Sequence, residues 1–185
     1  CMKKQLSYLM AALVMITFVA TGCKKDDKAP ENEEELITTV KLMFTEVGGT
    51  GTLTFTFKDV DGPGGNPPSL NEQIVLAPNK QYNCVIELLD ESKTPAEDIT
   101  DEVKEEANDH QFYFAPSGVN ITVSGLNNDP LGRPLGVTSV WTTGAASGPG
   151  TVKVTLKHKP GAKGANDPVT VGETDIEVNF AARVQ

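Results

Sequence analysis

The sequence predicts an all-β domain, an antiparallel immunoglobulin-like β-sandwich with one short surface helix. Two observations support this fold. Nine segments alternate β-branched or apolar residues with polar ones, and the stretches between them are rich in Gly, Pro, Asn and Asp. Alternation with a period of two is typical of half-buried strands, and frequent turns of this composition are typical of antiparallel sheets.

The predicted strands follow one another with turns between them. The first two form a hairpin, because the glycines in residues 48–51 supply a turn. In the second strand, Leu53, Phe55 and Phe57 share one face. Trp141, in the middle of a later strand, is expected at the centre of the core. The nine strands are residues 36–46, 52–58, 72–77, 81–90, 110–115, 119–126, 136–143, 151–158 and 173–184.

Residues 94–110 interrupt the strand pattern and predict one short helix. Ile99, Val103 and Ala107 recur at four-residue spacing, so they lie on one face of such a helix. Thr100 is a candidate N-cap. Because the apolar stripe is narrow and the other positions are very acidic, we expect a surface helix that crosses from one sheet to the other.

The N-terminal residues have the pattern of a bacterial lipoprotein signal. Two lysines precede an apolar segment, residues 9–20, that is too short for a comfortable transmembrane helix. The sequence Ala-Thr-Gly-Cys at residues 20–23 resembles a lipobox, in which a signal peptidase cuts before the cysteine that carries the lipid. We therefore predict that residues 1–22 are a signal peptide and that Cys23 is lipidated.

A charged segment that begins at the cysteine predicts where the protein is displayed. Residues 23–35 lack apolar periodicity, so we expect an acidic flexible tether ahead of a single domain, residues 36–185. The location that follows is the outer membrane, lipid-anchored, and the cell surface rather than the periplasm. Four residues resemble the export signal of surface-exposed Bacteroidota lipoproteins: Lys24, Lys25, Asp26 and Asp27.

Charge and cysteine content narrow the classes of function. The chain has 16 basic and 25 acidic residues, a net charge of −9, and loss of two lysines with the signal brings the charge to −11. An acidic protein of this kind is a poor binder of nucleic acid, whereas cations or basic partners suit it. With Cys23 lipidated, Cys84 has no disulfide partner in residues 23–185, and its apolar neighbours predict a buried, inert thiol.

The first candidate binding site lies at the end of the predicted helix. Glu105, Glu106, Asp109 and His110 combine one imidazole with several carboxylates, which is a donor set that can hold zinc or copper. Strong zinc signatures repeat Cys or His at fixed spacing, and this segment has one histidine, so a solvated acidic face is the alternative interpretation. His158 is flanked by two lysines, which is a poor electrostatic setting for a cation.

The second candidate is a calcium loop at residues 58–68. Asp59, Asp61 and Asn66 offer hard oxygen ligands near glycines, as calcium requires. The spacing departs from the EF-hand pattern, which requires a third residue with a side-chain oxygen and a distal Glu. A hairpin tip is therefore the alternative interpretation. Asp129 and Asp167 lie at similar predicted turns and are weaker candidates for calcium ligands.

The sequence gives little support to catalysis. It contains no Gly-x-Ser-x-Gly elbow, no HExxH motif and no Walker loop. Paired carboxylates occur only in charge runs, where solvation is the ordinary explanation. We therefore predict a protein that is not an enzyme, with no certain cofactor beyond a candidate divalent cation.

The chain resembles a group of small outer-membrane lipoproteins of the Bacteroidota over essentially all of its predicted mature length. The resemblance rests on the lipobox, the acidic tether and the segments NEEELITTV, TPAEDITDEVKEEANDHQF, WTTGAASGPGTVKVTLKHKPG and GETDIEVNF. Such proteins often carry the label "type 1 periplasmic binding fold superfamily". That fold needs two doubly wound α/β domains, and this chain is too short and too strand-rich for it.

The setting of these relatives resembles that of lipoproteins that accompany TonB-dependent outer-membrane receptors, which implies capture of nutrients or metals. The first functional hypothesis is therefore a lipid-anchored, non-enzymatic envelope protein that is accessory to such an uptake system. Its partners would be the membrane, through the lipid, and an outer-membrane receptor protein. The alternatives are a lipoprotein that binds a divalent metal, either zinc or copper or else calcium, and a purely structural envelope protein.

Overall fold

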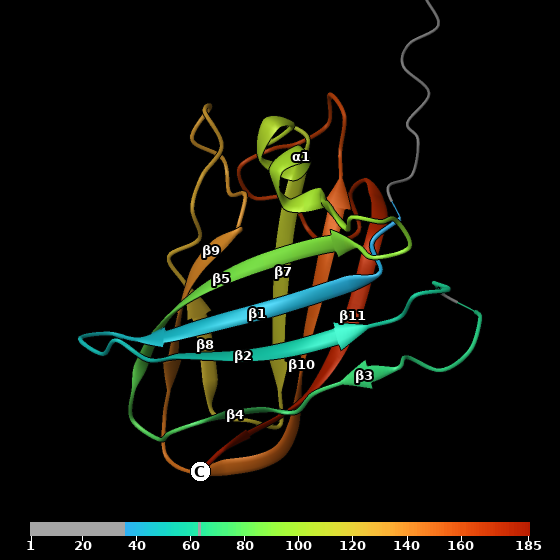
Figure 1. Ribbon diagram of the computed structural model, residues 1–185. Coiled ribbons are helices and arrows are strands. Elements are labelled where there is room, and N and C mark those ends of the chain that lie inside the picture. The colour runs from blue at the N-terminus through green and yellow to red at the C-terminus, as the bar shows by residue number, and fades with distance from the viewer. Residues whose placement is uncertain (1–35, 63) are drawn as a thin grey trace, which may run out of the picture. The chain divides into compact units, whose positions relative to one another are not determined.

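The computed structural model describes residues 36–62 and 64–185, and their fold is mostly β, with two sheets and one short helix (Figure 1). The predicted signal peptide, Cys23, the export signal and the tether lie outside the described residues. Within the described part of the chain, no helix is long and apolar enough to cross a membrane. The elements are β1 (Thr39–Glu46), β2 (Thr52–Lys58), β3 (Leu70–Asn71), β4 (Ile74–Leu76), β5 (Gln81–Asp90), β6 (Glu97–Asp98), α1 (Ile99–Glu105), β7 (His110–Ser117), β8 (Ile121–Ser124), β9 (Thr138–Thr143), β10 (Ser147–His158) and β11 (Glu173–Val184).

The strands form a seven-stranded and a four-stranded sheet. The larger sheet has the order β3-β2-β1-β5-β9-β8, with β6 also paired to β5, and the smaller has the order β4-β11-β10-β7. β1, β2 and β5 cross in front of β7, β10 and β11 at a steep angle (Figure 1). All strand pairs are antiparallel except β4 and β11, which are parallel. The expectation of a wholly antiparallel arrangement is therefore wrong at this one edge.

Each of the nine predicted strands is present, with ends shifted by up to four residues. The predicted hairpin is confirmed, because β1 and β2 pair antiparallel with Val40 opposite Phe57 and Phe44 opposite Leu53. Two-residue strands β3 and β6 were not expected, since segments this short carry no alternation to detect. Local alternation of side chains was therefore enough to find the long strands.

The core lies between the two sheets, with Trp141 at its centre. This side chain is 0% exposed, as predicted, and its ring contacts Phe44 of the larger sheet at 4.9 Å and Phe114 of the smaller sheet at 5.6 Å between centroids. Its indole N–H donates to Ser139 Oγ, so burial leaves no polar atom of the ring unsatisfied. Cys84 is also buried, and burial raises the pKa of its thiol, in agreement with an inert role.

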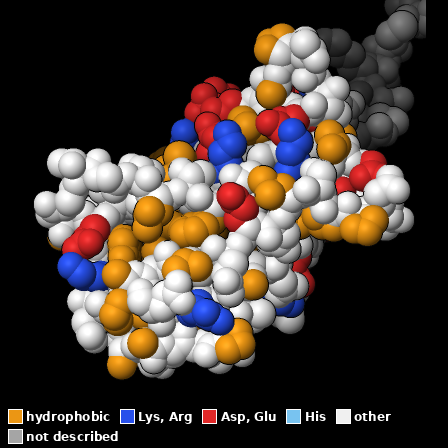
Figure 2. Space-filling model, turned by 60° about the horizontal axis from the view of Figure 1, so that its bottom comes forward, with side chains coloured by type: hydrophobic (Ala, Val, Ile, Leu, Met, Phe, Trp, Pro, Cys, Tyr) orange, Lys and Arg blue, Asp and Glu red, His pale blue; other side chains and the backbone are white. Residues whose placement is uncertain are grey.

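The face of β2 that carries Leu53, Phe55 and Phe57 is buried at one end and exposed at the other. Phe55 and Phe57 pack partly against the core, but Leu53 on the same face is 46% exposed. Hydrophobic side chains therefore show at the surface on the face of the molecule in Figure 2, among charged residues of both signs.

The helix is shorter than predicted and has a different cap. Asp98, not Thr100, is the N-cap: its side chain accepts a hydrogen bond from the backbone N–H of Thr100 at 2.8 Å. Thr100 is instead buried and bonds the backbone of Leu88 in β5. Ile99 and Val103 are buried on the predicted face, so α1 packs on the larger sheet through its narrow apolar stripe.

Replacement of Asp98 by alanine is expected to lower the free energy of unfolding by about 1 kcal/mol, because α1 loses the side chain that satisfies its first free N–H group. Urea denaturation measures the change. Asp101→Ala, in the exposed first turn, is the matched control with an expected loss of a few tenths of a kcal/mol. An equal loss in both variants contradicts the capping role.

Candidate functional site

The two histidines of the sequence, His110 and His158, meet at the paired ends of β7 and β10. The antiparallel register places them directly opposite each other, and their rings stack with centroids 4.5 Å apart and planes 9° from parallel. Both side chains are buried. Residues that are far apart in the sequence are therefore brought into contact by the pairing of two strands.

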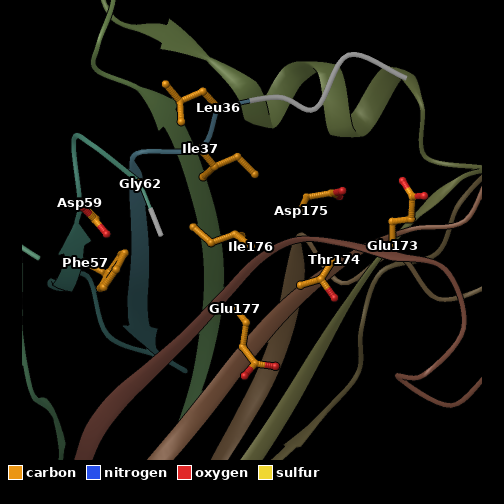
Figure 3. A pocket seen from close by; sticks show the side chains of 10 residues that line it. All are labelled: Leu36, Ile37, Phe57, Asp59, Gly62, Glu173, Thr174, Asp175, Ile176 and Glu177. Atoms are coloured by element: carbon orange, nitrogen blue, oxygen red, sulfur yellow. The ribbon is translucent and has the colours of Figure 1, made fainter. Parts of the chain in front are cut away.

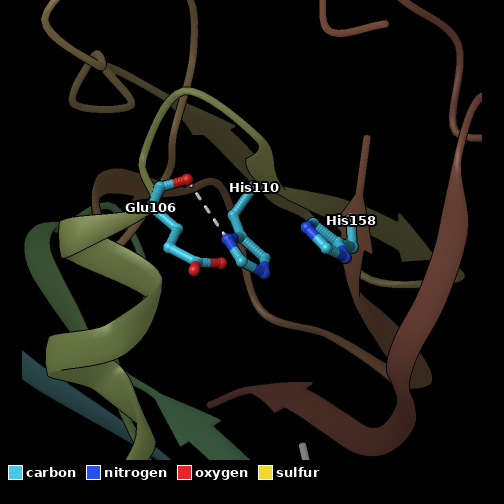
Figure 4. A group of neighbouring side chains, drawn as sticks. All are labelled: Glu106, His110 and His158. Carbon is cyan, nitrogen blue, oxygen red and sulfur yellow. Dashed lines mark hydrogen bonds between the residues drawn. The ribbon is translucent and has the colours of Figure 1, made fainter. Parts of the chain in front are cut away.

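Glu106 completes a group of three metal-binding side chains. It lies in the turn after α1, and its backbone carbonyl is 3.2 Å from His110 Nδ1 (Figure 4). One ligand atom from each of Glu106, His110 and His158 lies within 4.8 Å of the other two. Glu106 is exposed whereas both histidines are buried, so the group, called here the histidine cluster, lies at the surface end of the core.

The surroundings of His110 keep its imidazole neutral. Burial, followed by the proximity of His158, lowers its pKa from the ordinary value of 6.5 to about 4. Because a carbonyl can only accept, the contact with Glu106 O assigns the proton to Nδ1 and leaves the lone pair on Nε2. That atom lies 3.7 Å from Asp175 Oδ2, so the lone pair faces a carboxylate.

The structure brings together only part of the predicted metal set. Glu106 and His110 belong to the histidine cluster, as the sequence suggested, whereas Glu105 is exposed at the end of α1. Asp109 has a structural role, because its Oδ1 accepts from Gly161 N at 3.2 Å and its carbonyl accepts from Lys159 N at 2.6 Å. It fastens the turn before β7 to the loop after β10.

The sequence interpretation missed His158 because of its two lysine neighbours. Successive residues of a strand point to opposite faces, so Lys157 and Lys159 do not share the surroundings of His158. Lys157 Nζ bonds Thr174 Oγ1 at 2.8 Å, and Lys159 Nζ bonds Gln111 Oε1 at 2.8 Å. The period-two alternation already present in residues 151–158 was the signal that could have kept His158 as a candidate.

A buried ionic network holds the turn that carries Glu106. Lys163 Nζ lies 3.1 Å from Asp129 Oδ2, both side chains being 0% exposed, and it also donates to Ala107 O at 2.7 Å. Arg133 joins Asp129 through Nε at 2.8 Å and reaches Asn108 O at 2.9 Å. Two loops, the one between β8 and β9 and the one between β10 and β11, are thus tied to residues 107 and 108, between the helix and His110. Asp129, a weak calcium candidate in the sequence, is a structural ion-pair partner here.

A cavity of about 400 Å³ lies beside the histidine cluster. It is lined by residues just before β1, by residues at and after the end of β2, and by the first half of β11. Figure 3 shows Asp59 and Phe57 on one side, with Asp175 and Ile176 on the other. Asp175 lines this cavity and is also the carboxylate that faces His110. The remaining lining residues are Leu36, Ile37, Gly62, Glu173, Thr174 and Glu177.

Two residues of the predicted calcium loop, Asp61 and Asn66, bind each other. Asp61 Oδ2 accepts from both the backbone N–H and the side-chain amide of Asn66, at 2.8 and 2.6 Å. These bonds lower the pKa of Asp61 and use one of its oxygens inside the loop. Asp59 is buried and lines the cavity instead. Calcium binding by Asp59, Asp61 and Asn66 stays a prediction.

The described fold and the histidine cluster together define a β-rich protein that carries two imidazoles and a carboxylate at one end of its smaller sheet. The chain matches no protein-family model, no curated protein and no solved structure. Its function is therefore inferred from these residues and from the chemistry they can perform.

Proposed function

We propose that this protein is a lipid-anchored, non-enzymatic envelope protein that binds a divalent transition-metal ion through Glu106, His110 and His158. The observation that carries the proposal is the convergence of three ligand atoms within 4.8 Å. Two of them are imidazole nitrogens from the only histidines in the sequence.

The donor set favours zinc, copper or nickel over calcium. Imidazole nitrogen binds these transition metals well, whereas calcium and magnesium take oxygen ligands. Two histidines and one glutamate supply three ligands, which leaves a fourth position of a tetrahedral ion for water or for a group from another molecule. An open position of this kind suits a protein that captures a metal ion and passes it on.

Binding requires a small movement of the histidine cluster. Ligand atoms of a tetrahedral zinc ion lie about 3.3 Å apart, given bonds of about 2.0–2.1 Å. Lone pairs of an imidazole lie in its ring plane, and the two rings are only 9° from parallel. One ring must therefore turn so that both planes pass through the ion. The side chain of Glu106 is exposed at the end of a short helix, so it can turn towards the ion with little loss of packing.

Calorimetric titration of the full chain with zinc, copper and calcium tests the proposal. We expect saturable binding of zinc or copper, with affinity reduced by at least about 100-fold in His158→Ala and in Glu106→Gln, because loss of a mere outer-shell partner of a ligand already costs about 10–100-fold. Glu105→Gln is the matched control, because it removes the same charge one residue away without touching the histidine cluster. Equal affinities of wild-type protein, His158→Ala and Glu106→Gln would falsify the proposal.

The two sheets, with a core shared between them, support the further proposal that the domain is a β-sandwich. Their steep crossing is typical of orthogonal rather than aligned packing of sheets. The immunoglobulin-like strand order stays a prediction.

The role as an accessory of a TonB-dependent receptor rests on the lipobox and on the resemblance stated above. Crosslinking and pulldown of tagged full-length protein from native membranes tests it, with Cys23→Ala as the control that removes the anchor. We expect an outer-membrane receptor to be recovered with wild type and lost with the variant. If no receptor is recovered and no metal binds, the protein is a structural component of the envelope.

A further inference from the structure

The cavity between β2 and β11 has a chemistry that the histidine cluster does not use. Its described lining includes four carboxylates and no lysine, arginine or histidine. One of the four, Glu177, forms an ion pair with Lys153 at 2.7 Å. The other acidic lining residues are Asp59, Glu173 and Asp175, so every described ionisable side chain that lines the cavity is a carboxylate.

Asp59 is the residue that points to a ligand. Its side chain lines the cavity, the residue is only 9% exposed, and Oδ1 accepts no hydrogen bond from the described residues. Its backbone is fixed, because Asp59 N–H donates to Thr38 O at 2.8 Å. A desolvated carboxylate oxygen without a donor is costly, and the cost is relieved when a charged donor binds to it.

The walls of the cavity select the kind of cation. Leu36, Ile37, Phe57 and Ile176 give it an apolar side. The only described group of three or more side chains placed to share a metal ion is the histidine cluster, so the carboxylates of the cavity do not converge on one point. A ligand that carries one charged head on a hydrocarbon body suits both the carboxylates and the apolar side, whereas a bare metal ion makes no use of the apolar side.

We propose that this cavity binds a small alkylammonium ion, with the ammonium group donating to Asp59 Oδ1 and the alkyl chain against Phe57 and Ile176. A volume of about 400 Å³ is in the range of small-molecule sites and exceeds what a five-carbon amine needs. The same chemistry is offered by a free amine and by the side chain of a lysine in a peptide.

Titration of the ¹⁵N-labelled full chain with n-pentylamine, in the presence of a metal chelator, tests the proposal. We expect saturable chemical-shift changes in residues 57–62 and 173–177, and no saturation with n-pentanol, which has the same chain without the charge. N-acetyl-lysine amide separates the two sources: binding as tight as that of pentylamine assigns a lysine side chain, and binding of pentylamine alone assigns a free amine.

The matched variants are Asp59→Asn and Asp101→Asn, which remove one charge each from the cavity and from the surface of α1. We expect Asp59→Asn to weaken pentylamine binding at least tenfold and Asp101→Asn to leave it unchanged. Asp59→Asn should keep its fold, since asparagine has the size of aspartate and Oδ1 accepts no hydrogen bond from the described residues, and its dispersed spectrum verifies this. Pentanol binding as tightly as pentylamine, absence of saturable shifts, or unchanged affinity in Asp59→Asn overturns the proposal. Because the chelator removes metal, these outcomes are independent of the histidine cluster.

Discussion

Replacement of Asp129 by alanine is expected to lower the free energy of unfolding by about 3–5 kcal/mol, the usual cost of removing one partner from a buried ion pair. Its side chain is 0% exposed, and Lys163 Nζ lies 3.1 Å from it. Oδ1 accepts from the backbone N–H groups of Leu131 and Arg133 at 2.9 and 2.8 Å. Burial alone would raise the pKa of Asp129, but these donors outweigh it and lower the pKa to about 2.

The loss of unfolding free energy is large because Lys163 remains buried without its carboxylate partner. In Asp129→Ala the ammonium of Lys163 remains buried with only Ala107 O as a described hydrogen-bond acceptor. The double variant Asp129→Ala/Lys163→Met removes both charges, and we expect it to be more stable than Asp129→Ala alone. Urea denaturation of wild type, both single variants and the double variant gives the coupling energy of the pair. A loss below about 1 kcal/mol in Asp129→Ala contradicts a buried pair.

The same substitution connects stability to the histidine cluster. Arg133 links Asp129 to Asn108, and Lys163 links it to Ala107, in the turn between Glu106 and His110. We therefore expect Asp129→Ala to weaken zinc binding even though Asp129 is not a ligand.

Acidification of the metal-free protein from pH 6.5 to pH 4 is expected to remove about 3 kcal/mol of unfolding free energy. His110 has an ordinary pKa of 6.5 and a pKa of about 4 in the folded chain. Each pH unit between the two values corresponds to about 1.4 kcal/mol. The described groups around its ring are His158, Glu106, Asp109, Lys163 and Asp175.

The sign follows from proton binding in the two states. Between pH 6.5 and 4 the unfolded chain binds a proton at His110 and the folded chain does not, so lowering the pH favours unfolding. Stability is therefore full above pH 6.5 and is lost as the pH falls towards the folded pKa. Asp129 contributes in a separate window, because its pKa falls from 3.8 to about 2 on folding and its stabilisation is lost only below pH 3.8.

Chemical denaturation at several pH values, with a chelator present, measures this dependence. His110→Gln is the control, since a neutral side chain of similar size cannot take up the proton. We expect the slope of unfolding free energy against pH to be much flatter in this variant between pH 6.5 and 4. Identical slopes in the two proteins show that His110 does not carry the effect.

The sequence by itself determined nine of the strands, the presence of one short helix and the centre of the core. Alternating side chains report locally on which face of a strand is buried, so residues 81–90 and 173–184 were recognised as strands with little or no shift at their ends. Trp141 and Cys84 were predicted to be buried because large apolar side chains, and unpaired thiols in apolar runs, are usually found in the core. Glu106 and His110 were found together because they are four residues apart.

Only the tertiary structure decided which distant residues meet. His158 joins His110 because β7 and β10 pair in one particular register. Asp59 and Asp175 line the same cavity because the fold brings the residue after β2 and the first half of β11 to its two sides (Figure 3). Asp129 is neutralised by Lys163, which follows it by two strands in the chain. Sequence patterns describe the faces of single elements, whereas strand register and sheet packing are set by the sum of many weak contacts between them. A site built across those contacts therefore leaves no local signature.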